Sequence, residues 1–149
     1  DPKNKVFIAI GDNSIRRKIY DKLRINNISL NTTLIHSNTT ISKSSLIEEQ
    51  TFLSAGVIIN AQVKIGIGCI INTGAIIEHE CSIGQFSHIA PGAVLAGNVS
   101  IGSGCMVGAN AVIKQGVIVG DNVIIGAGAV VLKDVNSETT YVGNPAKEI

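Results

Sequence analysis

The chain has 149 residues, the length of one ordinary domain, and its 12 Lys and Arg almost balance its 11 Asp and Glu, leaving a formal net charge of +1. This balance gives no electrostatic basis for a nucleic-acid or membrane-surface partner. Only 3% of the residues are aromatic and none is Trp, which argues against a surface that stacks nucleobases.

The rest of the composition favours an aliphatic interior built from many short strands. Hydrophobic residues make up 45% of the chain, and 25 Ile stand beside 16 Gly, a pairing of strand formers with turn formers. No apolar run reaches the roughly 18 residues of a membrane span, and we expect no signal peptide. Three Cys without a CxxC spacing indicate neither a disulfide framework nor a zinc site. We therefore expect a cytoplasmic protein that binds no metal ion.

Residues 1–34 differ in pattern from the rest of the chain. The apolar run at residues 6–10 ends at Gly11 and predicts a strand, and Asn13 or Ser14 can cap a helix that continues through about Leu23. Residues 28–35 then lead into the next part of the chain. This strand–helix–strand pattern is too short for a core of its own. We expect part of a small Rossmann-like α/β domain whose first half is absent.

From residue 35 onward an aliphatic residue recurs every six positions without a slip. The seventeen positions are Ile35, Ile41, Ile47, Leu53, Ile59, Ile65, Ile71, Ile77, Ile83, Ile89, Leu95, Ile101, Val107, Ile113, Val119, Ile125 and Val131. The residue four positions after each of them is small. Such a hexapeptide repeat predicts one short strand and one corner per hexad, with three hexads closing a triangular coil of 18 residues.

The corners and the interior follow from this register. Gly and Asn fill the corners, where a positive φ is often needed. These residues are Gly66, Gly68, Asn98, Gly102, Gly104, Asn110, Gly120, Asn122, Gly126 and Gly128. All three Cys fall on small inward positions, so we interpret them as buried hydrophobic side chains rather than nucleophiles or metal ligands.

The outward residues fall into three columns, because each face recurs every 18 residues. The first column is Ile58, Ile76, Val94, Val112 and Val130, and the second is Lys64, Ser82, Ser100 and Ile118. The third is Ile70, His88, Met106 and Ile124. A monomer would not leave the aliphatic first column in water, so we expect subunits to associate through it, with the third face near the joint.

The three histidines are the residues most suited to chemistry. His36 lies in the first coil, where a surface or capping role is expected. His79 lies in a corner between the first and second faces, and His88 lies half a coil further on. The two rings cannot meet within one chain but can meet across a joint between subunits; the alternative is two unrelated surface imidazoles. Spacings of 43 and 9 residues do not arrange three imidazoles around one zinc ion.

Three motifs resemble those of the bacterial hexapeptide-repeat nucleotide-sugar acetyltransferases. They are INTGAIIEHECSIGQFSH at 71–88, AGNV at 96–99 and VGNPAK at 142–147. The chain most closely resembles the UDP-4-amino-sugar N-acetyltransferases of bacillosamine synthesis, with the sialic acid O-acetyltransferase family as a near relative. The resemblance implies a mainly β fold, in which residues 35–149 form a left-handed parallel β-helix. It also implies acetyl-CoA as cosubstrate and a homotrimer with active sites between subunits.

The same resemblance implies roles for individual residues. His79 matches the general base, and Glu80 matches the carboxylate that raises its basicity. Adjacent residues in a regular strand point apart, so this pair requires a corner geometry. His88 matches an acetyl-CoA contact. Gly97, which stacks on His79 one coil higher, leaves room for the thioester and offers its N–H to the oxyanion.

Four further positions complete the expected site. Ala109 and Ala127 match small residues on the path of CoA, and Asn72 matches a substrate contact, although a corner Asn also has a purely structural interpretation. The family binds the nucleotide of its acceptor near the N-terminus. Residues 1–34 are thus expected to be the remnant of a nucleotide-sugar-binding domain, with Gly11 facing an anionic group at the helix N-terminus.

The expected function is acetyl-CoA-dependent N-acetylation of a UDP-4-amino-4,6-dideoxy sugar. No activated Ser or Cys nucleophile is recognisable, so we expect the amine to attack the thioester directly. One alternative is O-acetylation of sialic acid or another sugar. An alternative of another class is a non-catalytic trimeric β-helical binding module.

Overall fold

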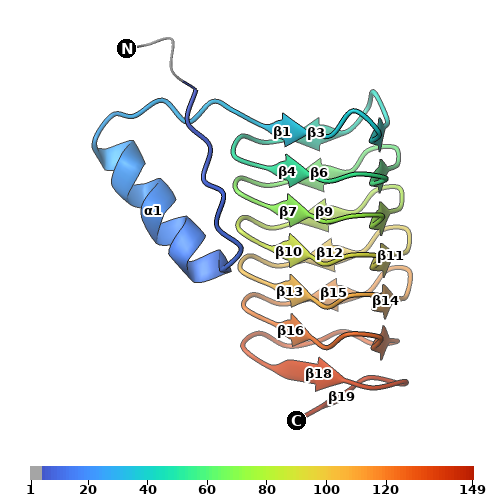
Figure 1. The fold of residues 1–149 in the computed structure, drawn as a ribbon. Coiled ribbons are helices and arrows are strands. Elements are labelled where there is room, and N and C mark those ends of the chain that lie inside the picture. The colour runs from blue at the N-terminus through green and yellow to red at the C-terminus, as the bar shows by residue number, and fades with distance from the viewer. Residues whose placement is uncertain (1–4) are drawn as a thin grey trace.

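Each hexad folds into one two-residue strand and one corner (Figure 1). The computed structural model describes residues 5–149. The strands of the repeat are β1 (Leu34–Ile35), β2 (Thr40–Ile41), β3 (Leu46–Ile47), β4 (Phe52–Leu53), β5 (Ile58–Ile59), β6 (Lys64–Ile65), β7 (Ile70–Ile71), β8 (Ile76–Ile77), β9 (Ser82–Ile83), β10 (His88–Ile89), β11 (Val94–Leu95), β12 (Ser100–Ile101), β13 (Met106–Val107), β14 (Val112–Ile113), β15 (Ile118–Val119), β16 (Ile124–Ile125) and β17 (Val130–Val131). A hairpin of β18 (Thr140–Val142) and β19 (Lys147–Glu148) follows them.

Strands three hexads apart lie side by side and form the three faces of a prism. Face A contains β1, β4, β7, β10, β13, β16, β18 and β19; face B contains β2, β5, β8, β11, β14 and β17; face C contains β3, β6, β9, β12 and β15. The register is 18 residues, since Val94 pairs in parallel with both Ile76 and Val112. The predicted three-hexad coil and left-handed parallel β-helix are therefore confirmed.

Aliphatic side chains fill the interior of the prism. From Leu53 to Val131, the inward residue that ends each strand is at most 3% exposed. Burying each such side chain stabilises the fold by about 1.5–3 kcal/mol. Ile35 is 49% exposed because the first coil has a stacked neighbour on one side only.

A column of hydrogen-bond donors lines the inner side of the corner between faces C and A. Its members are Thr51, Cys69, Ser87 and Cys105. The Cys69 thiol donates to the carbonyl of Gly84 over 3.1 Å, just as the Ser87 hydroxyl donates to the carbonyl of Gly102 over 2.8 Å. The cysteines are buried and unpaired, as predicted, and burial raises the pKa of Cys69 to about 12. Their interpretation as purely hydrophobic side chains is incomplete, because these thiols are also donors.

Two corner positions restrict the residue type in many of the corners, for different reasons. The third residue after the inward aliphatic has a left-handed backbone, with φ of +66° at Gly68 and +57° at Asn98. At the first position the next coil comes close: a Cβ on Gly102 would lie 2.6 Å from the backbone N of Asp121. The positive-φ prediction is confirmed for Gly68, Asn98, Gly104, Asn110, Asn122 and Gly128 and is wrong for Gly66, Gly102, Gly120 and Gly126.

The N-terminal segment forms one helix, α1 (Asn13–Ile25), which lies beside the prism (Figure 1). The predicted caps, Asn13 and Ser14, are wrong, since the carboxylate of Asp12 accepts the N–H of Ile15 over 2.8 Å. The Asn13 side chain instead donates to the carbonyl of Cys105 on the prism. Within residues 5–149, no helix is both long enough and apolar enough to cross a membrane.

The predicted strand at residues 6–10 is wrong, because no strand pairs with this segment and a side chain satisfies its backbone instead. Gln50, which is buried, accepts the N–H of Ile8 through Oε1 and donates to the carbonyls of Val6 and Leu30 through Nε2. Ile8 and Leu30 also pack in an apolar cluster with Phe86 of the prism. The segment thus shares its core with the β-helix, consistent with being too short for its own.

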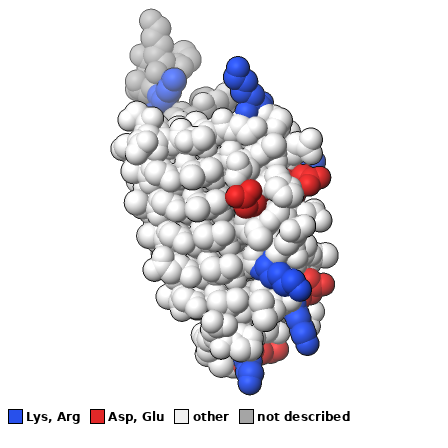
Figure 2. Space-filling view, turned by 90° about the vertical axis from the view of Figure 1, so that its right-hand side faces the viewer, with Lys and Arg blue, Asp and Glu red and all other residues white. Residues whose placement is uncertain are grey.

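Face B presents a broad surface with few charges (Figure 2). Figure 2 looks onto the side where β11 and β14 lie in Figure 1, and its charged side chains gather mainly along one edge. The outward residues of this face are Thr40, Ile58, Ile76, Val94, Val112 and Val130. The predicted aliphatic column is confirmed as a continuous surface feature.

Candidate functional site

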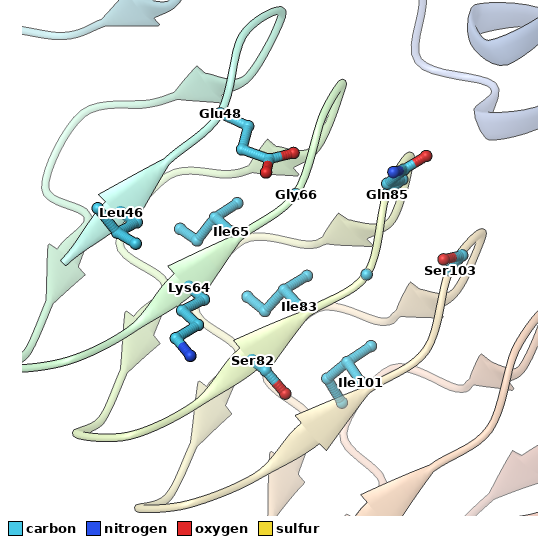
Figure 3. A pocket seen from close by; sticks show the side chains of 11 residues that line it. Leu46, Glu48, Lys64, Ile65, Gly66, Ser82, Ile83, Gln85, Ile101 and Ser103 are labelled. Atoms are coloured by element: carbon cyan, nitrogen blue, oxygen red, sulfur yellow. The ribbon is translucent and has the colours of Figure 1, made fainter.

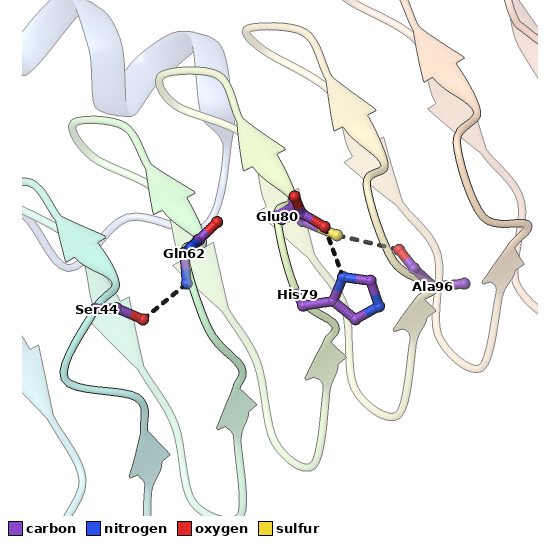
Figure 4. A network of polar contacts seen from close by, with 6 residues as sticks. Ser44, Gln62, His79, Glu80 and Ala96 are labelled. Atoms are coloured by element: carbon purple, nitrogen blue, oxygen red, sulfur yellow. Dashed lines mark hydrogen bonds and ion pairs between the residues drawn. The ribbon is translucent and has the colours of Figure 1, made fainter.

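His79 and Glu80 form an exposed pair at the corner between β8 on face B and β9 on face C. Their side chains are 51% and 57% exposed, and His79 Nδ1 lies 3.0 Å from Glu80 Oε2 (Figure 4). The contact depends on the backbone of Glu80, whose φ of +62° turns the chain so that neighbouring side chains reach each other. The corner geometry that this pair requires is therefore present.

This pair can do acid–base chemistry. A carboxylate beside Nδ1 favours the tautomer with its proton on Nδ1, which leaves the lone pair of Nε2 free to accept another proton. The carboxylate also stabilises the imidazolium once it forms. An imidazole held in this way has the geometry to accept a proton from a bound substrate.

Gly97, in the next coil along the chain, lies against the His79 ring, as the 18-residue register predicts. A Cβ on Gly97 would lie 2.5 Å from both Cε1 and Nε2 of His79. The N–H of Asn98 also donates to the carbonyl of His79 over 2.8 Å, which joins the two corners. Because Gly97 has no side chain, the Nε2 edge of the ring can lie against the backbone of this corner.

His88 lies in β10 on face A and pairs with Asn72. The sequence analysis did not predict this contact. The amide Nδ2 of Asn72 lies 3.2 Å from His88 Nε2, and its Oδ1 accepts the N–H of Thr73 over 2.8 Å. This places the amide donor toward Nε2 and hence the ring proton on Nδ1. The 18-residue register contained the signal, because Ile70, two residues before Asn72, pairs with His88.

The N-terminal segment encloses the His88 side of face A. Gly11 and His88 both line a cavity of about 320 Å³ under residues 7–11, and both line a second cavity of about 340 Å³ at the start of α1. Asn72 lines the first cavity as well. The structure thus brings together three predicted site residues, Gly11, Asn72 and His88, within one chain.

The other predicted residues lie at different corners. Ala109 and Ala127 follow β13 and β16 at the corner between faces A and B, and the N–H of Gly128 donates to the carbonyl of Ala109. His79 and Gly97 occupy the corner between faces B and C, so the His79 corner and the Ala109 corner border opposite edges of face B. Within one chain the predicted residues therefore form two separate groups.

A third cavity, of about 360 Å³, lies on face C (Figure 3). Polar side chains on its wall include Glu48, Lys64, Ser82, Gln85 and Ser103. It holds neither a histidine nor a cysteine, and none of the predicted site residues lines it. The pair of His79 and Glu80 therefore lies outside this cavity.

Two further predictions concern histidine and cysteine. His36 is exposed and accepts the N–H of Asn38 through Nδ1 over 3.0 Å, which confirms its surface and capping role. Burial raises the pKa of the Cys81 and Cys105 thiols, so neither is a ready thiolate nucleophile. Across residues 5–149, no three His, Cys, Asp or Glu side chains converge where they could hold a metal ion.

Family models of hexapeptide-repeat transferases match two stretches of the prism. The model described as the hexapeptide repeat of succinyl-transferase matches residues 98–133. The model described as bacterial transferase hexapeptide (six repeats) matches residues 80–115. Both stretches lie within the predicted repeat.

Three solved structures are similar to almost the whole chain. The acetyltransferase domain of PglB from Neisseria gonorrhoeae, in complex with acetyl coenzyme A, is 36% identical with a TM-score of 0.94, over 100% of this chain and 73% of that one. PerB from Caulobacter crescentus, in complex with CoA and GDP-perosamine, is 40% identical with a TM-score of 0.95, over 98% and 70%. WeeI from Acinetobacter baumannii is 32% identical with a TM-score of 0.93, over 100% and 73%.

Proposed function

The chain belongs to the bacterial hexapeptide-repeat nucleotide-sugar acetyltransferases, and on that premise we propose that it moves the acetyl group of acetyl-CoA to the amine of a UDP-4-amino-4,6-dideoxy sugar. The observation that carries the proposal is the pair of His79 Nδ1 and Glu80 Oε2, 3.0 Å apart beneath Gly97. The pair supplies a base whose free nitrogen, Nε2, lies next to Gly97, which has no side chain.

The proposed reaction needs no covalent enzyme intermediate. The amine nitrogen attacks the thioester carbonyl carbon, a C–N bond forms, and the carbonyl electron pair moves to oxygen. His79 Nε2 takes the proton that the nitrogen loses, while Glu80 stabilises the imidazolium. The oxyanion pair then re-forms the C=O bond as the C–S bond breaks, and the departing CoA sulfur keeps the C–S electron pair and takes a proton from His79. Every proton and electron pair is accounted for by these groups.

The nature of the acceptor is the finer part of the proposal. The PerB structure holds GDP-perosamine, and that enzyme is a perosamine N-acetyltransferase, which favours an amine over a hydroxyl acceptor. The choice of UDP rests on the motif at residues 71–88. We assign Gly11 and Asn72 to the acceptor, in keeping with residues 1–34 being part of a nucleotide-sugar-binding unit. His88, Gly97, Ala109 and Ala127 are assigned to acetyl-CoA.

We further propose a homotrimer whose active sites lie between subunits. The support is the apolar face B together with the two groups of site residues on opposite edges of it. Joining the His79 corner of one subunit to face A of the next would place His79 beside the partner's His88. We place the reaction in the cytoplasm, where three unpaired buried cysteines stay reduced.

The test is a turnover assay of the full-length protein with acetyl-CoA. The panel contains UDP-, GDP- and dTDP-linked 4-amino sugars, the matching 4-hydroxy sugars and free sialic acid. We expect CoA release only with amino sugars, fastest with a UDP sugar, and an N-acetyl product by mass spectrometry. Acetylation of a hydroxyl, or release independent of any sugar, would overturn the proposal.

A further inference from the structure

Arg16 is the most completely bonded charged side chain of the structure. It is 2% exposed, and each of its five N–H groups has an acceptor. The acceptors are the carbonyls of Gly68 (2.7 Å), Ile10 (2.9 Å), Gly11 (3.0 Å) and Phe86 (3.1 Å) and the side-chain Oδ1 of Asn13 (2.7 Å). All of them are neutral, so the guanidinium gains hydrogen bonds but no ion pair from them.

These bonds connect the two walls of the cavities beside His88. Gly11 belongs to the turn before α1, and Phe86 lies two residues before His88 on the prism. Both cavities beside His88 are bounded by Gly11 on one side and by His88 on the other. Because one rigid guanidinium holds the carbonyls of both walls, the position of Arg16 determines how far apart they lie.

The same guanidinium adds positive charge next to His88. Burial, and then the charge of Arg16, lowers the pKa of His88. The other charged group that lines a cavity with His88 is Asp12, whose carboxylate is occupied by the helix N-terminus. Asn72 and Met106, which also adjoin the ring, are uncharged. The imidazole therefore stays neutral, with Nε2 accepting from Asn72.

We propose that Arg16 is a positioning residue of the transfer site, which fixes the Gly11 turn against the strand of His88 and so sets the width of the acceptor cavity. The inference rests on the proposed function for the identity of the ligand. The connection between Gly11 and His88 does not depend on it. Binding and protonation can therefore be measured separately.

The test compares Arg16→Lys and Arg16→Met with Arg17→Met as a matched control. Arg17 is the next residue of the same helix, is exposed, and lies 5.7 Å from the Phe86 ring, so its loss removes the same charge from outside the cavity. Lys has three donors in place of five. We expect both Arg16 variants to raise the KM of the acceptor by about tenfold, because the cavity walls lose the bonds that hold them together. The KM of acetyl-CoA should change less, because His88 alone among the four residues assigned to acetyl-CoA lines these cavities.

The second readout is the titration of His88 by NMR, which is practical because the chain has only three histidines. A nearby cation disfavours the imidazolium, so Arg16→Met should raise the pKa of His88, whereas Arg16→Lys and Arg17→Met should leave it at the wild-type value. A merely structural role would lower the melting temperature without raising the KM of the acceptor in the folded enzyme, whereas the His88 titration reports how close the charge of Arg16 lies to the ring.

The outcomes test the proposed function and the role of Arg16 separately. A wild-type enzyme that acetylates no sugar would contradict the proposed function, while the His88 titration would still test Arg16. If Arg16→Met does not fold, Arg16→Lys decides, because it keeps the charge and loses carbonyl contacts. A folded Arg16→Lys with the wild-type acceptor KM, or a folded Arg16→Met with an unchanged His88 titration, would overturn the inference.

Discussion

At the residue scale, the proposed base depends on one backbone angle. Glu80 has a φ of +62°, a conformation that costs a residue with a Cβ about 1–2 kcal/mol. This backbone conformation brings its carboxylate to 3.0 Å from Nδ1 of the preceding His79. Sequence neighbours on a straight strand could not meet in this way, so the corner makes the pair possible.

The first prediction concerns His79. His79→Ala should lower kcat by about 10²- to 10⁴-fold, the usual contribution of a general base, while the Kd of acetyl-CoA changes little. His36→Ala, another exposed histidine, is the control and should leave kcat unchanged. Steady-state kinetics and calorimetric binding measure both quantities. An unchanged kcat in His79→Ala would remove the general-base role.

A second prediction follows from the contact between Gly97 and the imidazole. In Gly97→Ala the new methyl would lie 2.5 Å from His79 Nε2, so the ring must rotate away from Glu80. We expect at least about a tenfold loss of kcat, but a loss of less than about 1 kcal/mol in stability, because the ring is half exposed and free to move. In a His79→Ala background, Gly97→Ala should lower kcat by much less than it does in the wild type, because only its acetyl-CoA contact remains to be disturbed. Additive losses would contradict the proposed coupling.

At the scale of elements, the corners of the hexad repeat are closed in different ways. The corners between faces C and A contain inward thiol or hydroxyl donors, such as Cys69 toward Gly84 and Ser87 toward Gly102. Corners between faces A and B instead close with a backbone bond, as from the N–H of Ala75 to the carbonyl of Asn72. The corner between C and A is also where α1 docks through Arg16.

The third prediction tests the donor column with Cys69. Cys69→Ser keeps a donor and should cost less than about 1 kcal/mol of stability, whereas Cys69→Val leaves the Gly84 carbonyl without it and should cost about 1–3 kcal/mol. Thermal unfolding of the two variants gives the comparison. Equal melting temperatures for Ser and Val would show that the thiol acts only by filling space.

At the scale of the whole molecule, the apolar face B and the separation of His79 from His88 are both explained by association of subunits. An apolar face of this extent favours association, and association would complete a site that one chain holds in two groups. Each aspect can be tested separately, one by assembly and the other by activity.

The fourth prediction is that Val94→Asp breaks the assembly. An unpaired carboxylate buried against aliphatic side chains costs several kcal/mol. Ile118→Asp on face C is the matched control, since that residue is 56% exposed and should stay in water. Analytical ultracentrifugation should find a trimer for the wild type and the control and a monomer for Val94→Asp. An intact Val94→Asp trimer would refute the assignment of face B.

The fifth prediction is that two inactive variants complement each other. Mixed trimers of His79→Ala and His88→Ala chains should recover part of the wild-type activity, because some joints regain both imidazoles. Co-expression with two tags, followed by native mass spectrometry, establishes that mixed trimers are present. Verified mixed trimers without recovered turnover would contradict a shared site.

The prism itself was predictable from the sequence alone. A six-residue period in aliphatic side chains specifies strands, corners and an 18-residue register, and the register in turn places His79 under Gly97 and His88 on another face. Periodicity can carry this information because each coil repeats the same local contacts with its neighbours. The same 18-residue register predicts the aliphatic column of face B.

What only the tertiary structure decided are contacts that do not repeat. Arg16 reaches carbonyls 52 and 70 residues away, and Gln50 replaces a strand partner for residues 6–8, 42 residues before it. Each is a polar side chain satisfied by a distant partner, and neither its own residue type nor its neighbours encode where that partner will lie. These contacts form only when the N-terminal segment docks and the coils stack, because burial then leaves each polar group no water to bond.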